Sequence, residues 1–263
     1  TFGANVAYSE ARTNKTLTSG GLYGSSGDGA LGRVYNFEPS DDMKHYLNDD
    51  GTRYRLLGDR LAPWDESDNP YRIINKNKLS DSTERFTGSF NIRADVTDWM
   101  WIAYRMGIDK YTSKSANRIA PNGVVKQVWQ NGMMSDNQTD YKYLTTNLMV
   151  NFNKAFGDFD FNLMVGTSTD DTKVSSTYLK SFDLQVPDFF SYDNTPDTNR
   201  AFAHSKSRKR LVGVFGELRA DWNSTVFLTV TGRNDWTSTL PIENRSYFYP
   251  SVSGAVIFTN FMQ

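Results

Sequence analysis

The sequence predicts an all-β protein, a transmembrane antiparallel β-barrel built from successive hairpins, on three observations. Apolar and polar residues alternate with period two over runs of about ten or more residues, the length that crosses a bilayer at a tilt. Short turns alternate with much longer polar loops, and aromatic residues gather near the ends of the alternating runs. Together these features indicate short periplasmic turns, long extracellular loops and two aromatic girdles.

The clearest hairpin lies between Leu211 and Arg233. Its first half places Val212, Val214, Gly216, Leu218, Ala220 and Trp222 on one face and Gly213, Phe215, Glu217, Arg219 and Asp221 on the other, wetter face. Asn223-Ser224 is a two-residue turn signal, after which the alternation resumes. We expect Leu228 to face lipid near mid-membrane, so that Leu228→Arg costs about 2–4 kcal/mol whereas Thr229→Arg is tolerated.

The same pattern predicts the remaining strands. The first run, 2–8, reads as the end of a strand, and the last run covers 247–258. Two further hairpins are expected, 85–108 around Thr97-Asp98 and 144–166 around Gly157-Asp158.

The long loops are expected over 10–82, 112–140, 169–207 and 237–245. A short helix is predicted at 41–47, capped by Ser40 with acids in its first turn. A short strand is a candidate at 124–129 within the second loop.

The aromatic residues are interpreted as two girdles. Those beside the short turns are Trp99, Trp101, Phe156, Phe159, Trp222 and Phe227. Those towards the long loops are Tyr111, Tyr141, Tyr143, Trp236, Tyr247, Phe248 and Tyr249.

Two alternative architectures share this alternation. A soluble β-sandwich also alternates, but its strands are usually five or six residues long and its loop lengths are not segregated by side. A small complete barrel of eight strands is the second alternative, because only eight or nine strand candidates are present.

Composition excludes several function classes. A net charge of -1 argues against nucleic-acid binding, and the absence of cysteine excludes disulfides and thiol catalysis. No apolar run approaches the roughly 20 residues of a transmembrane helix. The two histidines, His45 and His204, have no partners at catalytic or metal-binding spacing, so neither an enzyme nor a catalytic site is predicted.

No cofactor or metal site is predicted either. The acidic clusters at 49–50, 65–68 and 136–140 offer the oxygen ligands that calcium uses, but none follows the calcium-loop pattern. Solvated loop acids are the default interpretation of these clusters.

Several segments resemble SusC/RagA-type TonB-linked outer-membrane proteins. They are Asn69–Thr112 (NPYRIINKNKLSDSTERFTGSFNIRADVTDWMWIAYRMGIDKYT), RLVGVFGELRADWNSTVFLTVTGRNDW and YFYPSVSGAVIF, with GSSGDGALGR and SDDMKHYLNDDG similar to that family's first large extracellular loop. The chain departs from the family at Trp236-Thr237-Ser238-Thr239, where members often have a small, serine-rich turn.

The resemblance implies a 22-stranded barrel with an N-terminal plug, a TonB-contacting segment and a SusD-like lipoprotein lid. Residues 1–263 are then expected to be part of one barrel domain, with the plug, the TonB-contacting segment and the C-terminal strands lying outside this chain. The implied location is the outer membrane of a Gram-negative bacterium, and the implied partners are the TonB–ExbB–ExbD system and outer-membrane lipids.

The implied function is TonB-dependent import of an oligosaccharide or peptide too large for porins. Weak candidates for substrate contact are Trp64, Trp129, Arg93, Arg105, Glu217, Arg219 and Arg233, in the lumen or the loops. For any one of these charged residues, pairing with another charge is the simpler interpretation. A non-transporting structural or adhesive outer-membrane barrel is the alternative function.

Overall fold

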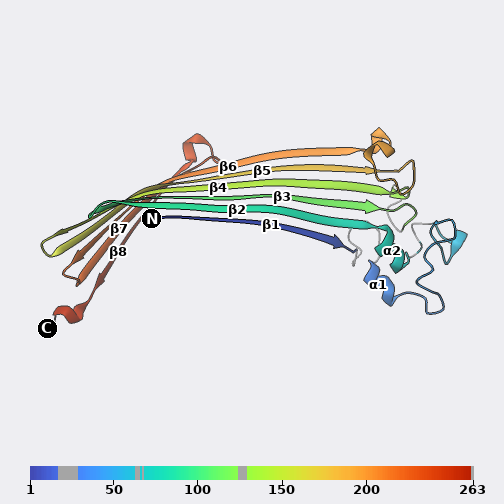
Figure 1. Cartoon of the computed structure of the whole chain (residues 1–263), viewed down its shortest axis with the longest axis horizontal. Coiled ribbons are helices and arrows are strands. Elements are labelled where there is room, and N and C mark those ends of the chain that lie inside the picture. The colour runs from blue at the N-terminus through green and yellow to red at the C-terminus, as the bar shows by residue number, and fades with distance from the viewer. Residues whose placement is uncertain (17–28, 63–65, 67, 124–128, 262–263) are drawn as a thin grey trace.

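The computed structural model describes residues 1–16, 29–62, 66, 68–123 and 129–261. Eight strands form one antiparallel sheet in the order β1-β2-β3-β4-β5-β6-β7-β8, so that each strand pairs with its neighbours in sequence (Figure 1). The strands are β1 (Phe2–Lys15), β2 (Lys78–Thr97), β3 (Met100–Ile119), β4 (Met133–Phe156), β5 (Phe159–Phe182), β6 (Ala201–Trp222), β7 (Val226–Thr237) and β8 (Ser246–Val256). The all-β antiparallel prediction is confirmed.

The connections differ at the two ends of the sheet, which we call the turn end and the loop end (Figure 1). At the turn end, Asn223 and Ser224 both have φ of 51°, the left-handed conformation of a type I′ hairpin turn. Gly157 is left-handed as well, with φ of 58°. The loop end carries the connections over 16–77, 120–132 and 183–200, whereas the 238–245 connection leaves in the same direction but beside Arg210, partway along β6. The predicted segregation of short turns from long loops is therefore confirmed.

The strands are longer than the alternation of apolar residues predicted. β4 and β5 have 24 residues each, and together with β3 and β6 they include about half of the segments that were expected to be loops over 112–140 and 169–207. Those loop predictions are wrong because both faces of the extended strands are polar there, which removes the apolar period while Thr, Tyr and Val keep their preference for strands. A single sheet of such strands also excludes the β-sandwich.

Two short α-helices lie at the loop end, α1 (Ala30–Tyr35) and α2 (Pro70–Lys76). The Asn69 side chain accepts a 2.8 Å hydrogen bond from the Tyr71 amide, and Pro70 occupies the first turn of α2. The helix predicted at 41–47 does not form. There the Asp42 carboxylate accepts a 2.9 Å hydrogen bond from the Lys44 amide and stabilises a turn instead. The strand candidate at 124–129 lies almost wholly outside the described residues.

Strand register sorts the side chains onto two faces, because residues directly opposite one another point the same way. Leu148, Thr167 and Val214 are opposite one another on the apolar face, and Met149, Gly166 and Phe215 on the polar face. The apolar face comprises Phe86, Phe90, Ile92, Ile102, Tyr104, Met106, Leu148, Val150, Phe152, Leu163, Val165, Val214, Leu218, Leu228 and Val230. The predicted division into apolar and polar faces is confirmed.

The register also corrects the depth of Leu228. Leu228 pairs with Ala220, which lies opposite Phe161 and then Lys154, so this row is near the turn end of the apolar face, one row from Phe156 and Phe159. Thr229 pairs with Arg219, so an arginine at position 229 adds a like charge directly opposite. The mid-face position is Leu148, halfway along β4 between Lys142 and Lys154.

The two predicted aromatic girdles are only partly confirmed, because several of their residues lie on the polar face. Phe156, Phe159 and Trp222 share one row on the apolar face at the turn end, next to a stacked pair of Trp99 and Phe152 with centroids 6.0 Å apart. Trp101 and Phe227 are on the polar face. Of the loop-end aromatics, Trp236 and Phe248 are on the apolar face, while the polar face has Tyr111, Tyr141, Tyr143, Tyr247 and Tyr249.

The buried core lies at the loop end and not within the sheet. Ile119 and Met133, at the ends of β3 and β4, pack with Ile73 of α2, Ala30 of α1 and Trp129, and Phe182 covers this cluster. The apolar face of the sheet is exposed, with Val214 at 50% and Leu148 at 42%. A face this extensive needs an apolar environment.

Candidate functional site

Most of the predicted charged candidates form ion pairs within the polar face. Arg93 lies 2.9 Å from Asp95 on the same strand, and its guanidinium lies 4.6 Å from the centroid of the Trp101 ring. Glu217 and Arg219 are 2.7 Å apart. These pairs agree with the simpler interpretation that charges on this face neutralise one another.

Arg105 differs from these residues. It is exposed on the polar face of β3, between Asn91 and Asn147 on the neighbouring strands. Within the described residues it forms no ion pair. Five N–H donors flanked by two amides are suited to binding a carboxylate or several hydroxyls.

Arg233 is held from three sides. Its Nε donates to Asp235 at 2.8 Å, its Nη2 donates to the Ser168 hydroxyl at 3.0 Å, and its guanidinium lies 5.7 Å from the Phe215 ring centroid. Two glycines leave the space for this arrangement. A Cβ at Gly166 would lie 2.6 Å from Phe215 Cζ, and one at Gly213 would overlap Arg233 Nη2 and Asp235 Oδ1.

We therefore expect Gly213→Ala to displace the Arg233–Asp235 pair and to destabilise the full-length protein by about 1–3 kcal/mol, because overpacking forces side chains from their preferred positions. Thermal unfolding of the detergent-solubilised protein measures this change. Gly216→Ala is the matched control, since it lies on the same strand and the nearest atom to its added Cβ is 3.7 Å away. Equal losses of stability in the two variants would contradict the packing role of Gly213.

The polar face also carries an aromatic cluster towards the loop end. Its tyrosines were predicted to belong to a girdle. The rings of Tyr111 and Tyr141 stack with centroids 4.8 Å apart and an interplanar angle of 16°. The neighbouring Arg85 binds Asp109 through two hydrogen bonds, at 2.9 and 2.6 Å, and Tyr143 donates to Asp170. Stacked rings beside fixed polar groups suit the flat faces of sugars or aromatic side chains. Strict period-two counting from Arg105 identifies the orientation of Tyr111.

The two predicted tryptophans are not brought together with these residues. Trp129 is buried in the loop-end core, at 7% exposure, and the Lys180 ammonium lies 4.3 Å from its ring centroid. This position gives Trp129 a packing role in the loop end. Trp64 lies outside the described residues.

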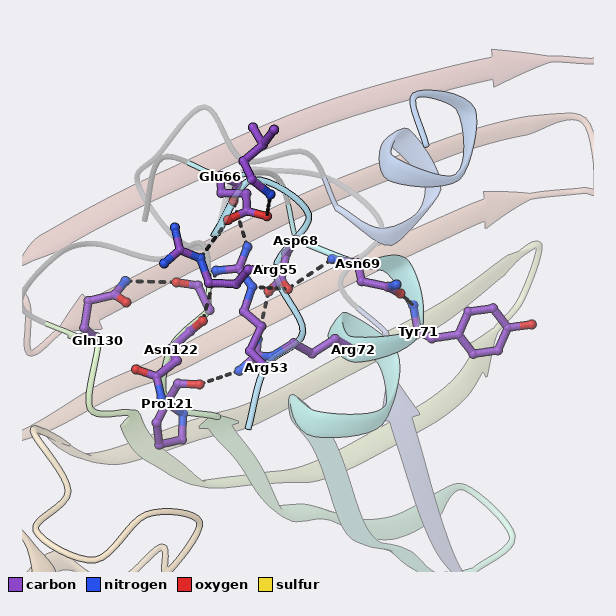
Figure 2. Close-up of polar contacts among 12 residues, drawn as sticks. Arg53, Arg55, Glu66, Asp68, Asn69, Tyr71, Arg72, Pro121, Asn122 and Gln130 are labelled. Carbon is purple, nitrogen blue, oxygen red and sulfur yellow. Dashed lines mark hydrogen bonds and ion pairs between the residues drawn. The ribbon is translucent and has the colours of Figure 1, made fainter. Parts of the chain in front are cut away.

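A buried network of charges fixes the loop end (Figure 2). Asp68 binds Arg72 at 2.8 Å and Arg53 at 3.5 Å, and all three side chains are at most 6% exposed. Glu66 accepts hydrogen bonds from Arg55 at 2.7 Å and from the Leu57 amide at 3.1 Å. Burial lowers the pKa of the Arg53 guanidinium from its usual value.

This network joins separate connections into one body. Arg53 donates to the Asn122 carbonyl at 3.0 Å, and Arg72 donates to the Pro121 carbonyl, so the 16–77 connection is bound to the 120–132 connection. The amide of Leu184 donates to the Asn131 carbonyl at 3.0 Å, which adds the 183–200 connection. We refer to these three joined connections as the loop body.

A second charged group lies where β3, β4 and the 183–200 connection meet. Arg118 binds Asp136 at 2.8 Å, and the Tyr192 hydroxyl donates to Asp136 at 2.6 Å. Burial, and next the hydrogen bond to Asp136, raise the pKa of Tyr192 well above its ordinary value. Tyr192 is therefore a neutral hydrogen-bond donor at physiological pH.

The acidic clusters have internal partners. Besides Glu66, Asp68 and Asp136, the Asp140 carboxylate accepts hydrogen bonds from Thr112 and Gln138, and Asp50 accepts from Thr52. In the described part of the chain, no three His, Asp or Glu side chains gather as a metal site would require. The helices described here include none that is long and apolar enough to cross a membrane.

Comparison with known proteins gives a consistent result. TonB-dependent receptor P3 of Formosa agariphila is 23% identical over 257 residues, which is 95% of this chain and 24% of that protein. The chain resembles TonB-dependent receptors. No protein-family model matches it.

Solved structures of peptide transporters share the fold. The RagAB peptide transporter superposes with a TM-score of 0.73 at 14% identity, over 100% of this chain and 29% of that chain. The RagAB peptide importer in the closed-closed state gives a TM-score of 0.68 at 13% identity, with the same two coverages. The predicted SusC/RagA resemblance is confirmed, and the chain spans about a quarter of the length of these relatives.

Proposed function

We propose that this chain is a segment of a TonB-dependent importer of the outer membrane, which takes up an oligosaccharide or peptide together with a SusD-like lipoprotein lid. The observation that carries the proposal is the two-faced sheet. One face is apolar and exposed, and the other is polar along successive rows of paired residues. In lipid such a sheet must be part of a closed barrel, with further strands paired to β1 and β8, because the hydrocarbon offers no hydrogen-bond partner to a free strand edge.

The polar face supports a route for a polar solute. Arg105, the stacked pair of Tyr111 and Tyr141, and the fixed guanidinium of Arg233 lie on the same side of the sheet. Charged and hydroxyl groups of this kind can hydrogen-bond to both sugars and peptide backbones, so both substrate classes are retained.

The loop body is consistent with the proposed lipoprotein lid. Three connections joined by buried ion pairs and hydrogen bonds form an ordered surface at the loop end, and such a surface loses less conformational entropy of its own when a partner binds.

The proposal predicts that uptake depends on TonB. A growth screen of a strain that lacks the whole gene, on oligosaccharides and on peptides, identifies the substrate. Deleting tonB in the wild-type strain is then expected to reduce uptake of that substrate to the background of the gene-deletion strain. Restoring tonB on a plasmid is the control. Undiminished uptake without TonB would contradict the proposal and favour a structural or adhesive barrel.

A further inference from the structure

A row of basic residues crosses four strands on the apolar side of the sheet. Lys110, Lys142, Lys173 and Arg208 lie directly opposite one another in the register of β3, β4, β5 and β6, and we call them the basic row. All four are exposed. Lys206 and Arg210 flank the row one step above and below it on β6.

The basic row has too few acids to neutralise it. Asp171 accepts a 2.9 Å hydrogen bond from Arg208 and lies 3.2 Å from Arg210, so its charge is shared between two arginines. Asp140 is occupied by hydrogen bonds from Thr112 and Gln138. Within the described residues, Lys110, Lys142 and Lys173 form no ion pair, whereas Arg118 and Asp136 pair on the same side nearer the loop end.

Like charges directly opposite one another destabilise a sheet. Two carboxylates, Asp140 and Asp171, lie on the same side as the three lysines but are bound by other partners, so the row keeps a net positive charge that an anion would compensate. The three lysines line a groove of about 420 Å³ together with Ser175, which lies on the same side as Lys173, so ammonium groups and a hydroxyl donor are available there. Ammonium groups with hydroxyls suit phosphate oxygens.

The position of the basic row along the strands indicates which kind of molecule supplies that anion. On β4 the row lies about twelve residues from Lys154, which is next to the row of aromatic residues at the turn end of the apolar face. At ~3.3 Å per residue and a tilt near 45°, this separation spans roughly 28 Å, close to the ~25 Å of an apolar barrel band. The row thus lies at the loop-end boundary of the apolar band, where lipid headgroups begin.

We propose that the basic row binds the phosphate groups of the glycolipid headgroup in the outer leaflet of the outer membrane. This inference rests on the membrane placement in the proposed function, though not on transport. Basic clusters beside an apolar membrane surface bind anionic headgroups, and each lysine contributes a similar increment of affinity. Continuity with the apolar face favours a lipid over a soluble protein partner.

The test measures retention of lipopolysaccharide on the purified full-length protein by native mass spectrometry through a detergent titration. The double variant Lys142→Gln/Lys173→Gln is expected to weaken retention about thirtyfold, the factor for two lysines near an anionic lipid surface. The matched control is Lys44→Gln/Lys154→Gln, which removes the same charge from two exposed lysines outside the row. Lys142→Arg/Lys173→Arg, which keeps the charge, is expected to retain the lipid and to show that the site tolerates substitution.

Three results would overturn the proposal. Equal losses in the two glutamine variants would show that only net charge matters. Equal retention of dephosphorylated lipopolysaccharide would show that the phosphate is not recognised, and displacement by millimolar inorganic phosphate would show a simple anion site. Because none of these measurements involves uptake, TonB-independent uptake leaves the lipid site standing, and loss of the lipid site leaves the importer standing.

Discussion

Asp68→Ala is expected to detach the loop body from the end of the sheet. The change leaves Arg53 and Arg72 buried without the carboxylate that both contact, and removing one partner of a buried ion pair costs about 3–5 kcal/mol. Arg72 also binds the Pro121 carbonyl, so its displacement breaks the contact between two connections. Hydrogen exchange of the full-length protein in detergent should then show lost protection of α2 and of the amides near Asn122.

Asp188→Asn is the matched control for this change, because asparagine removes the charge and tolerates the left-handed backbone at this position, where φ is 58°. Asp188 also pairs with a basic residue between two connections, Lys76 at 3.1 Å, but its side chain is 53% exposed. An exposed pair contributes at most about 1 kcal/mol. Similar loss of protection in both variants would show that the buried network does not hold the loop body.

Leu148→Arg is expected to be the most damaging single charge on the sheet. Leu148 lies midway between Lys142 and Lys154 on the apolar face, and an arginine at the bilayer midplane costs about 2–4 kcal/mol. Thr145→Arg is the control on the same strand, because it faces the polar side opposite Asp170, where a positive charge is favourable. The free energy of unfolding in lipid bilayers, from denaturant titration, measures both.

This pair of positions replaces Leu228 and Thr229, which the sequence alone favoured. Leu228 is too close to the turn end, and Thr229 is opposite Arg219. Equal costs at Leu148 and Thr145 would contradict the assignment of the two faces.

The sequence alone gives the side-chain direction at several positions where grouping aromatic residues by their place along the strand gave the wrong face. Tyr111, Tyr141 and Tyr143 cluster near strand ends as a girdle would, yet their parity along β3 and β4 places them on the polar face. Period two is a property of the strand itself, so counting from Arg105 gives the direction of Tyr111 without a structure. The same count places Lys110, Lys142, Lys173 and Arg208 each on the apolar side of its own strand.

The sequence alone does not predict which residues lie opposite one another on neighbouring strands. That the four basic residues form one row depends on register, which is set by hydrogen bonds between segments up to tens of residues apart. The space that Gly166 and Gly213 leave for Phe215 and Arg233 depends on the same register. The loop end was the least predictable part, because Arg53, Asp68 and Arg72 look like solvated loop charges until the fold buries them together.

The sequence by itself determined the antiparallel strands, their two faces and the short turns, because these follow from local periodicity and turn chemistry. It also determined the resemblance to TonB-linked proteins, which rests on the residues of short motifs. The tertiary structure decided the length of the strands, the depth of each residue, the basic row and the buried charges of the loop body. Those features depend on contacts between segments distant in the chain, and no local pattern records which segments meet.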